Sequence, residues 1–410
     1  MIALFCRFRP AWLTALALAL FLLAAPLTAF DDIDDLFSDP DAGIIEEDDS
    51  EDPDETVERP RVDIGALTTS APRFSGKVEL EGALAYGLTE WPGTEAAGGA
   101  SAADLLDGSV YYLMSSRFTI DARPRSYLRY YVALSTAMDT KKFTFPSPSV
   151  AEIFVDYTLA DFLYFRIGRQ SMTWGQGRLL GNPANLVSRL SGGVGVKGFM
   201  PLGPNGLTAV IYGKPEFFAD AGNPSYKEFG YAALFDTTVG PFSLGLSAHY
   251  QRNEPLALAA YAKTAIAGFD VTTEAVVRRT VNDDAPAADP DYKIIANLFR
   301  EFGSPAWQVI GEYLFDATVP DYAGHRIALG LLAPRFAHGW RPGVRFYHAF
   351  EDNSGQIVLG ADATVAPSLK LSLGVPITYG APGSFYREEN EDPGDRVASA
   401  IVRLGLSFSF

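Results

Sequence analysis

The chain has 410 residues, with 33 Lys+Arg against 50 Asp+Glu and a net charge of −17. A chain this acidic repels phosphate backbones, and no Lys/Arg-rich tract offsets the charge, so the composition excludes nucleic-acid binding. The single cysteine, Cys6, leaves no route to an intramolecular disulfide or a cysteine-ligated metal site.

The histidines argue against metal chemistry. There are four, His249, His325, His338 and His348, and they do not occur at the spacing of metal ligands. We therefore expect no metal and no cofactor, and we expect that the protein is not an enzyme.

Residues 1–29 have the pattern of a secretory signal peptide. Arg7 and Arg9 precede an apolar run over 11–25, and small residues end at Ala29. The run is too short for a lasting transmembrane helix, and no cysteine stands near the expected cleavage point to carry a lipid. A retained anchor is the alternative, but the pattern favours export of a chain that starts near Phe30.

Residues 30–73 form an acidic segment, called the leader below. Between Asp31 and Pro60 stand fifteen Asp+Glu against one basic residue, Arg59, so most of the net charge belongs to this segment. Such a block repels itself and buries little apolar surface, so we expect it to be disordered in the periplasm. A solvated spacer is the simplest role; the alternative is that its apolar islands, Leu36–Phe37 and Ile44–Ile45, dock on a partner.

From residue 74 to 410 the chain repeats segments of about ten residues in which every second side chain is apolar. In the last segment Val402, Leu404, Leu406 and Phe408 share one face, while Arg403 lies on the other. Because strand side chains alternate between faces, each segment has one apolar and one mostly polar surface. No stretch in this region reaches the length of apolar residues that a membrane-spanning helix needs.

We predict eighteen strands, with sixteen as the alternative. Their starts lie near residues 76, 109, 125, 150, 162, 191, 206, 226, 241, 256, 268, 291, 305, 324, 340, 355, 368 and 397. Tight links such as 160–161 and 203–206 alternate with longer ones such as 90–108 and 171–190. This alternation is typical of an all-β, transmembrane, antiparallel up-and-down barrel.

A soluble β-sandwich or propeller also has alternating strands. The predicted export, the absence of a shorter repeat and the aromatic residues near strand ends favour the membrane barrel. Membrane barrels have girdles of aromatic residues near the ends of their strands. The aromatic clusters at such positions include Tyr111–Tyr112, Tyr130–Tyr131, Phe229–Tyr231 and Tyr313–Phe315.

The C-terminal segment LGLSFSF, which ends at Phe410, resembles the last strand of outer-membrane β-barrel proteins of double-membraned bacteria. The resemblance implies an outer-membrane location, contact with outer-membrane lipid, and recognition of the last strand by the barrel-assembly machinery. It assigns Phe408 and Phe410 to this assembly signal. The oligomeric state stays open.

An eighteen-stranded barrel is wide enough for an aqueous interior. Charged side chains on the lipid face cost about 2–4 kcal/mol at mid-bilayer, so the charged positions of each strand are expected to line the pore. Segregated signs would create a field across the pore, whereas interleaved signs would pair along the wall. The predicted pore-lining residues are Arg117, Arg129, Glu152, Asp156, Arg166, Arg278, Arg345 and Arg403, together with Lys77, Glu79, Glu81, Glu274, Glu312 and Asp362.

Residues 166–189, RIGRQSMTWGQGRLLGNPANLVSR, differ from the other links in their density of Arg, Asn, Gly and Trp. Aromatic faces beside forked polar groups suit a sugar or a carboxylated solute. The alternative is that an inward-folded loop needs glycines for close packing and amides for its own backbone. The candidates for a constriction loop are Gln170, Trp174, Arg178, Asn182 and Asn185.

The same segment resembles substrate-selective porin families, which include alginate-export-like barrels. The resemblance rests on a strand that ends in Gly168, Arg169 and Gln170, followed by Trp174 and Gly175. It implies that these residues belong to a constriction loop or a wall turn.

The sequence therefore favours an outer-membrane channel for passive diffusion of small polar or anionic solutes, sugar-like or carboxylated. A structural or adhesive barrel is the second interpretation. An outer-membrane lipid hydrolase is the third, and it would need a catalytic histidine such as His348, whose parity is lipid-facing and which no nucleophile motif follows. The sequence identifies neither the solute nor the direction of transport.

Overall fold

The computed structural model describes residues 72–92, 98, 101, 105–138, 144, 147–187, 193–213, 229–252, 254–281, 291–319, 324–336, 339–366, 368–387 and 397–409. The predicted signal peptide, nearly all of the leader, His338 and Phe410 lie outside these residues.

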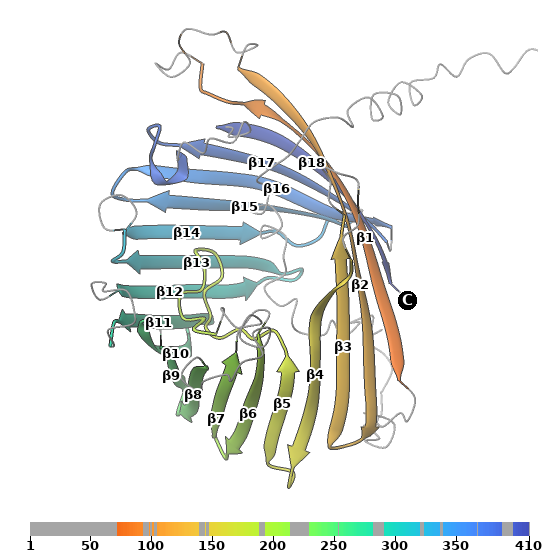
Figure 1. Cartoon of the computed structure of the whole chain (residues 1–410). Helices are drawn as coiled ribbons and strands as arrows, with labels where there is room; N and C mark the ends of the chain where they lie inside the picture. Colours follow the sequence, from red (N-terminus) through yellow and green to blue (C-terminus); the bar gives the residue numbers. More distant parts are fainter. Residues whose placement is uncertain are drawn as a thin grey trace, which may run out of the picture.

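Eighteen antiparallel strands form one closed sheet (Figure 1). Each strand pairs with its neighbours in the sequence, and β18 returns to pair with β1 over Lys77–Leu88. The strands are β1 (Arg73–Leu88), β2 (Leu106–Arg125), β3 (Leu128–Ala137), β4 (Ser149–Leu159), β5 (Leu163–Arg169), β6 (Val194–Leu202), β7 (Asn205–Gly213), β8 (Gly230–Val239), β9 (Phe242–Tyr250), β10 (Leu256–Ile266), β11 (Phe269–Arg279), β12 (Asp291–Phe302), β13 (Trp307–Asp316), β14 (His325–Leu332), β15 (Trp340–Ala349), β16 (Ser354–Ala366), β17 (Leu369–Tyr379) and β18 (Ala398–Ser409), with a short 3-10 helix, η6 (Phe385–Arg387), between the last two.

The predicted fold class and strand number are confirmed. All eighteen strands start within four residues of the predicted positions. The spacing of the apolar positions and of the turn residues was enough to locate them, because neither signal depends on distant parts of the chain.

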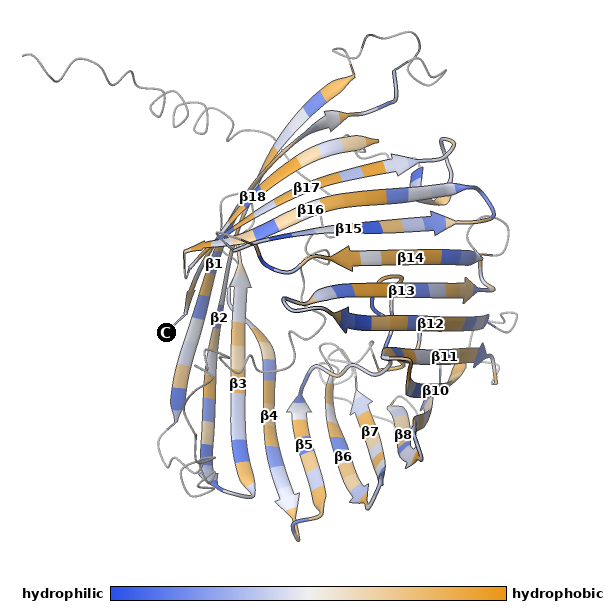
Figure 2. Ribbon diagram, turned by 180° about the vertical axis from the view of Figure 1, so that it is seen from behind, coloured by the Kyte–Doolittle hydropathy of each residue, from blue (hydrophilic) through white to orange (hydrophobic). Residues whose placement is uncertain are grey.

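The two faces of the sheet differ as the alternation predicts. On β18, Leu404 is 47% exposed on the outer face, while its neighbour Arg403 is 5% exposed and turned inward. Hydrophobic and hydrophilic bands alternate along the strands in Figure 2. A closed barrel whose outer face is apolar all round is stable only where lipid surrounds it, so this is a barrel of the outer-membrane type.

Aromatic side chains gather at the two ends of the outer face. Tyr86, Tyr250 and Tyr292 are exposed at one end of their strands, and Phe302 and Phe408 are exposed at the other. Amphipathic rings favour the level of the lipid headgroups. These two girdles mark the positions of the membrane surfaces.

The two rims carry different links. Seven of the links that follow even-numbered strands are tight. The one between β4 and β5, residues 160–162, turns through two consecutive left-handed residues, Ala160 (φ 52°) and Asp161 (φ 59°), as the centre of a type I′ turn requires. The longer links lie mostly on the opposite rim, although 251–255 and 350–353 are short. In outer-membrane barrels the short turns face the periplasm. We call this rim, which also holds the start of β1 and the end of β18, the turn rim.

No helix in the described part of the chain is long and apolar enough to cross a membrane.

Loss of residues 408–410 should prevent barrel assembly. Phe408 faces outward and is the register partner of Val78, so the truncation removes part of the β1–β18 closure and the predicted assembly signal together. We expect little folded protein in the outer membrane, measured by heat-modifiable mobility of membrane fractions.

The matched control is Phe302→Ser, which alters another exposed aromatic residue on the outer face, on β12. This variant should still assemble. Normal outer-membrane levels of the truncated chain would show that the last strand carries no assembly signal.

Candidate solute site in the lumen

The link after β5 folds into the barrel and crosses to the far wall (Figure 1). The backbone N–H groups of Arg178, Leu179 and Leu180 donate to the Glu312 carboxylate of β13, with the shortest contacts at 2.8, 3.2 and 2.6 Å respectively. Glu312 is 2% exposed, and a carboxylate has enough lone pairs to accept all three donors. A single wall residue thus holds the tip of residues 170–187, which we call the inner loop.

Three further wall side chains fasten the inner loop. Asn297 of β12 donates from Nδ2 to the carbonyl of Gln176 at 3.0 Å, and Arg278 of β11 donates from Nη2 to the carbonyl of Pro183 at 3.1 Å. At its start the Ser171 N–H donates to Glu152 Oε1 of β4 at 3.1 Å. The inner loop therefore spans the lumen between opposite walls.

The inner loop also has an apolar anchor. Trp174 is 8% exposed and packs in one buried cluster with Leu186 and Val187 of the loop and with Val210 and Tyr212 of β7. Ala232, Ala257 and Val276 extend this cluster along the wall. The indole is used for packing, so it does not present an open face in this arrangement.

The predicted amides serve the backbone of the loop. Asn182 Nδ2 donates to the carbonyl of Trp174 at 2.8 Å, and Asn185 Oδ1 accepts from the Trp174 N–H at 3.0 Å. Gly175 has φ +83°, and a Cβ there would meet Asn182 Oδ1 at 2.1 Å. Gln170 is buried and donates to the carbonyl of Arg166 at 3.3 Å. These contacts match the packing interpretation; a ligand role for Gln170, Trp174, Asn182 or Asn185 stays a prediction.

Arg178 differs from these residues. Its guanidinium lies over the ring of Phe299 at 5.1 Å, and within the described part of the chain it forms no ion pair. It therefore places a positive charge at the tip of the inner loop, where the nearby Glu312 carboxylate offsets it only in part.

A row of charged residues on β3–β6 forms part of the opposite wall. Arg129, Asp156, Arg166 and Lys197 are successive register partners across four strands. Asp156 binds Arg166 Nε at 2.6 Å and Arg129 Nη1 at 3.4 Å, while Asp121 binds Arg129 at 2.9 and 2.8 Å. Both arginines are thus neutralised in the row.

Lys197 is the exception in this row. It forms no hydrogen bond or ion pair with any described residue, and its register partners are Arg166 and Val210. Val210 belongs to the cluster that anchors the inner loop, so the ammonium lies on the wall beside the constriction. Like charges on directly opposed positions repel, which favours an anion between Arg166 and Lys197.

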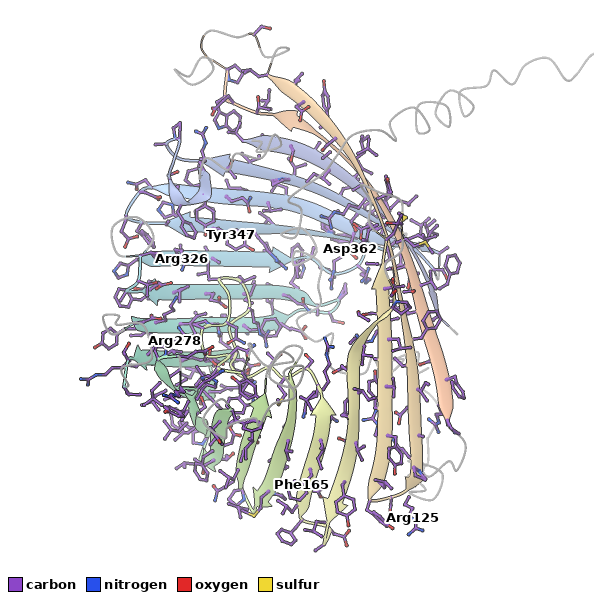
Figure 3. All side chains as sticks on the ribbon, in the orientation of Figure 1. Arg125, Phe165, Arg278, Arg326, Tyr347 and Asp362 are labelled. Atoms are coloured by element: carbon purple, nitrogen blue, oxygen red, sulfur yellow. The ribbon has the colours of Figure 1, made fainter. Side chains whose placement is uncertain are left out.

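Elsewhere the wall charges are interleaved. Arg117 pairs with Glu152 at 2.7 Å, Arg278 with Asp291 at 2.9 Å and Arg403 with Glu81 at 3.5 Å, while Arg345 is buried on β15. Figure 3 shows Arg278 and Arg326 on neighbouring parts of the wall. The wall is therefore mostly paired, which the sequence left open.

Sequence reasoning missed six further charged residues of the wall, although strand parity could have found them. They are Lys197, Asp121, Lys293, Asp316, Arg326 and Arg341.

A second segment also packs against the wall. The Phe385 N–H of η6 donates to Asp352 at 2.6 Å, the Phe385 ring lies 4.8 Å from the Arg326 guanidinium, and Arg387 binds Glu90 at 2.6 Å. Burial raises the pKa of the neighbouring Tyr386. Nothing in the sequence pattern pointed to this contact, because residues 380–387 have no periodicity.

Each histidine in the described part of the chain hydrogen-bonds to a tyrosine hydroxyl, and His325 does so with Tyr313 at 2.6 Å. Buried His249 accepts or donates a 2.6 Å bond with the Tyr212 hydroxyl. His348 has the lipid-facing parity predicted for it, and in the described part of the chain its hydrogen bond is to the Tyr379 hydroxyl at 2.9 Å.

No protein-family model matches the chain, and no curated protein matches it. Among solved structures it is similar to OccK2 (OpdF) of Pseudomonas aeruginosa, crystallised with glucuronate, at a TM-score of 0.53 and 9% identity, over 83% of this chain and 96% of that one. It is also similar to OpdK of the same organism, at a TM-score of 0.50 and 9% identity, over 82% and 99%. The chain has the fold of bacterial outer-membrane porins.

Glu312→Gln should loosen the inner loop. A carboxamide offers one acceptor oxygen in place of two and turns N–H donors toward the donors of residues 178–180. Each buried donor left without an acceptor costs about 1–3 kcal/mol, so the inner loop should detach from the wall more readily. We expect a lower unfolding temperature of the protein and noisier single-channel currents.

The matched control is Glu301→Gln, at a carboxylate whose partner is the side chain of Gln308 and which has no bond to the inner loop. Identical current noise in both variants would show that Glu312 does not hold the loop.

Proposed function

We propose that the protein is an outer-membrane channel for passive diffusion of small polar solutes, with preference for anions. The observation that carries this proposal is the position of two cations that form no ion pair with any described residue. Arg178 projects from the inner loop and Lys197 lies on the wall beside the cluster that anchors it. A solute that passes the constriction meets these charges in a water-filled lumen bounded by low-dielectric walls, which raises the local anion concentration.

The paired wall supports the same function in a different way. Ion pairs such as Arg129 with Asp121 and Arg403 with Glu81 keep a polar surface in contact with water without adding net charge. A polar solute then exchanges water contacts for wall contacts, and the cations without ion pairs make the pore favour solutes of negative charge.

The solute class follows from the chemistry of these groups. A carboxylate matches the ammonium of Lys197 and the guanidinium of Arg178, and hydroxyl groups match the paired polar wall. The glucuronate named with OccK2 has both kinds of group. We therefore propose small carboxylated, sugar-like solutes, and a non-enzymatic role.

Lys197→Gln should shift ion selectivity toward cations. A unit charge about 4 Å away in water contributes about 1 kcal/mol, so the anion-to-cation permeability ratio should fall about fivefold. The measurement is the reversal potential of the refolded protein in a planar bilayer under a salt gradient.

The matched control is the double variant Glu81→Gln with Arg403→Gln, which removes a complete ion pair and leaves the net charge of the wall unchanged. Its reversal potential should stay near that of the unchanged protein. Equal reversal potentials in all three proteins would contradict the selectivity assignment.

The solute class is tested with liposomes that contain the protein. Swelling in glucuronate should exceed swelling in glucose, because only glucuronate carries the carboxylate that Lys197 and Arg178 attract. The Lys197→Gln protein should lose most of this difference. A folded barrel that neither conducts nor admits solutes would instead favour the structural or adhesive role.

A further inference from the structure

The inner face of β1 and β2 carries a group of cations at the turn rim. Arg73 and Lys77 lie on β1, and Arg117, Arg123 and Arg125 lie on β2; all five are exposed. Arg73, Lys77, Arg117 and Arg123 share the lumen-facing parity, whereas Arg125 follows a shift in the β2–β3 register and lies opposite Leu128 at the turn. We call them the rim cations. The position of Arg125 at the β2–β3 turn is visible in Figure 3.

The carboxylates near this group do not balance it. Lys77 binds Glu79, Arg123 lies 3.7 Å from Asp121, and Arg117 binds Glu152 of β4. Asp121 and Glu152 are shared with Arg129 and with the inner loop. Arg73 and Arg125 form no ion pair among the described residues, so the rim cations retain positive charge.

Two of the rim cations directly oppose each other. Lys77 and Arg117 are register partners on adjacent strands, and their side chains are 52% and 45% exposed. Like charges in directly opposed positions destabilise a sheet unless an anion lies between them. Glu79 and Glu152 offset part of this repulsion, and the exposed side chains leave room for a polyanionic partner that approaches from the turn rim.

The chain itself supplies such a partner. Arg73 is the first residue of β1, so the leader joins the barrel within the rim cations. The acidic block at 31–60 contains fifteen carboxylates and lies only twelve residues, 61–72, before β1. Twelve residues span at most about 40 Å, so the block reaches the rim and the lumen behind it.

We propose that the acidic leader, residues 31–60, binds the rim cations and occupies the periplasmic mouth of the barrel. Tethering gives the block an effective concentration on the order of millimolar at its target, even if the untethered affinity is weak. Bound there, it competes with solute anions for the positive charge and lowers the anion preference of the pore at low salt. Because the interaction is between exposed charges, high salt weakens it.

The first experiment measures binding, which does not depend on the proposed channel function. A labelled synthetic peptide of residues 31–60 is titrated against the detergent-solubilised barrel that lacks residues 31–58, and fluorescence anisotropy is recorded at low and high salt. We expect binding at low salt that high salt removes.

The triple variant Lys77→Gln, Arg117→Gln, Arg123→Gln should bind the peptide at least tenfold more weakly. The control variant is Lys263→Gln, which removes a cation of β10 on the opposite side of the barrel. It should bind the peptide as strongly as the unchanged barrel.

The second experiment measures currents in a planar bilayer. At low salt the variant without residues 31–58 should have a larger conductance and a stronger anion preference than the mature chain, and the two should converge at high salt. Peptide added to the compartment that faces the turn rim should restore the smaller current, and peptide added to the other compartment should not.

The two experiments separate the possible failures. No peptide binding by the leader-deleted barrel, or equal binding by the triple variant, overturns the leader proposal and makes the leader a spacer. Binding with identical currents in both chains overturns the effect on permeation. Binding by a barrel that never conducts leaves the docking intact and overturns the proposed channel.

Discussion

The pairing of β18 with β1 is the constraint on which the rest of the structure depends. In lipid, every backbone N–H and C=O needs a partner within the protein, and an open sheet edge has none. Closure over Lys77–Leu88 removes both edges and fixes which face of each strand meets lipid. The charged positions are then forced into a common interior. The same closure brings the two ends of the barrel segment together on the turn rim, beside the rim cations.

The inner loop shows how a wide barrel becomes a narrow one. Polar backbone inside a lumen must be bonded to water or to the wall, and here four wall side chains supply the bonds. Glu312 has the largest share, because one buried carboxylate accepts three consecutive N–H groups. The apolar cluster around Trp174 fixes the base of the loop, so the tip with Arg178 is held from both sides. The constriction is therefore a property of the wall as much as of the loop.

The fold could be predicted from the sequence because its signals are local. Alternation and turn residues located all eighteen strands, including β18, whose apolar face is continuous. The site could be predicted only in part. Strand parity turned Arg166 and Asp156 inward, but their pairing depends on the register between β4 and β5, which no local pattern records. Glu312 was expected in the lumen, yet its bond to residues 178–180 spans more than 130 positions. The segment around Phe385 has no periodicity and could not be predicted.

The distribution of partners, and not the number of charges, decides what the lumen can do. Arg129 and Arg166 are prominent in the sequence, but Asp121 and Asp156 neutralise them. Lys197 is inconspicuous in the sequence, yet it retains its charge because its register partners are an arginine and a valine. The rim cations follow the same principle: Arg125 lies opposite Leu128, and the carboxylate opposite Arg73, Asp121, is bound by Arg129. Positive charge is thus left over at two levels, beside the constriction and at the turn rim, and at the second level the chain itself carries fifteen carboxylates within reach.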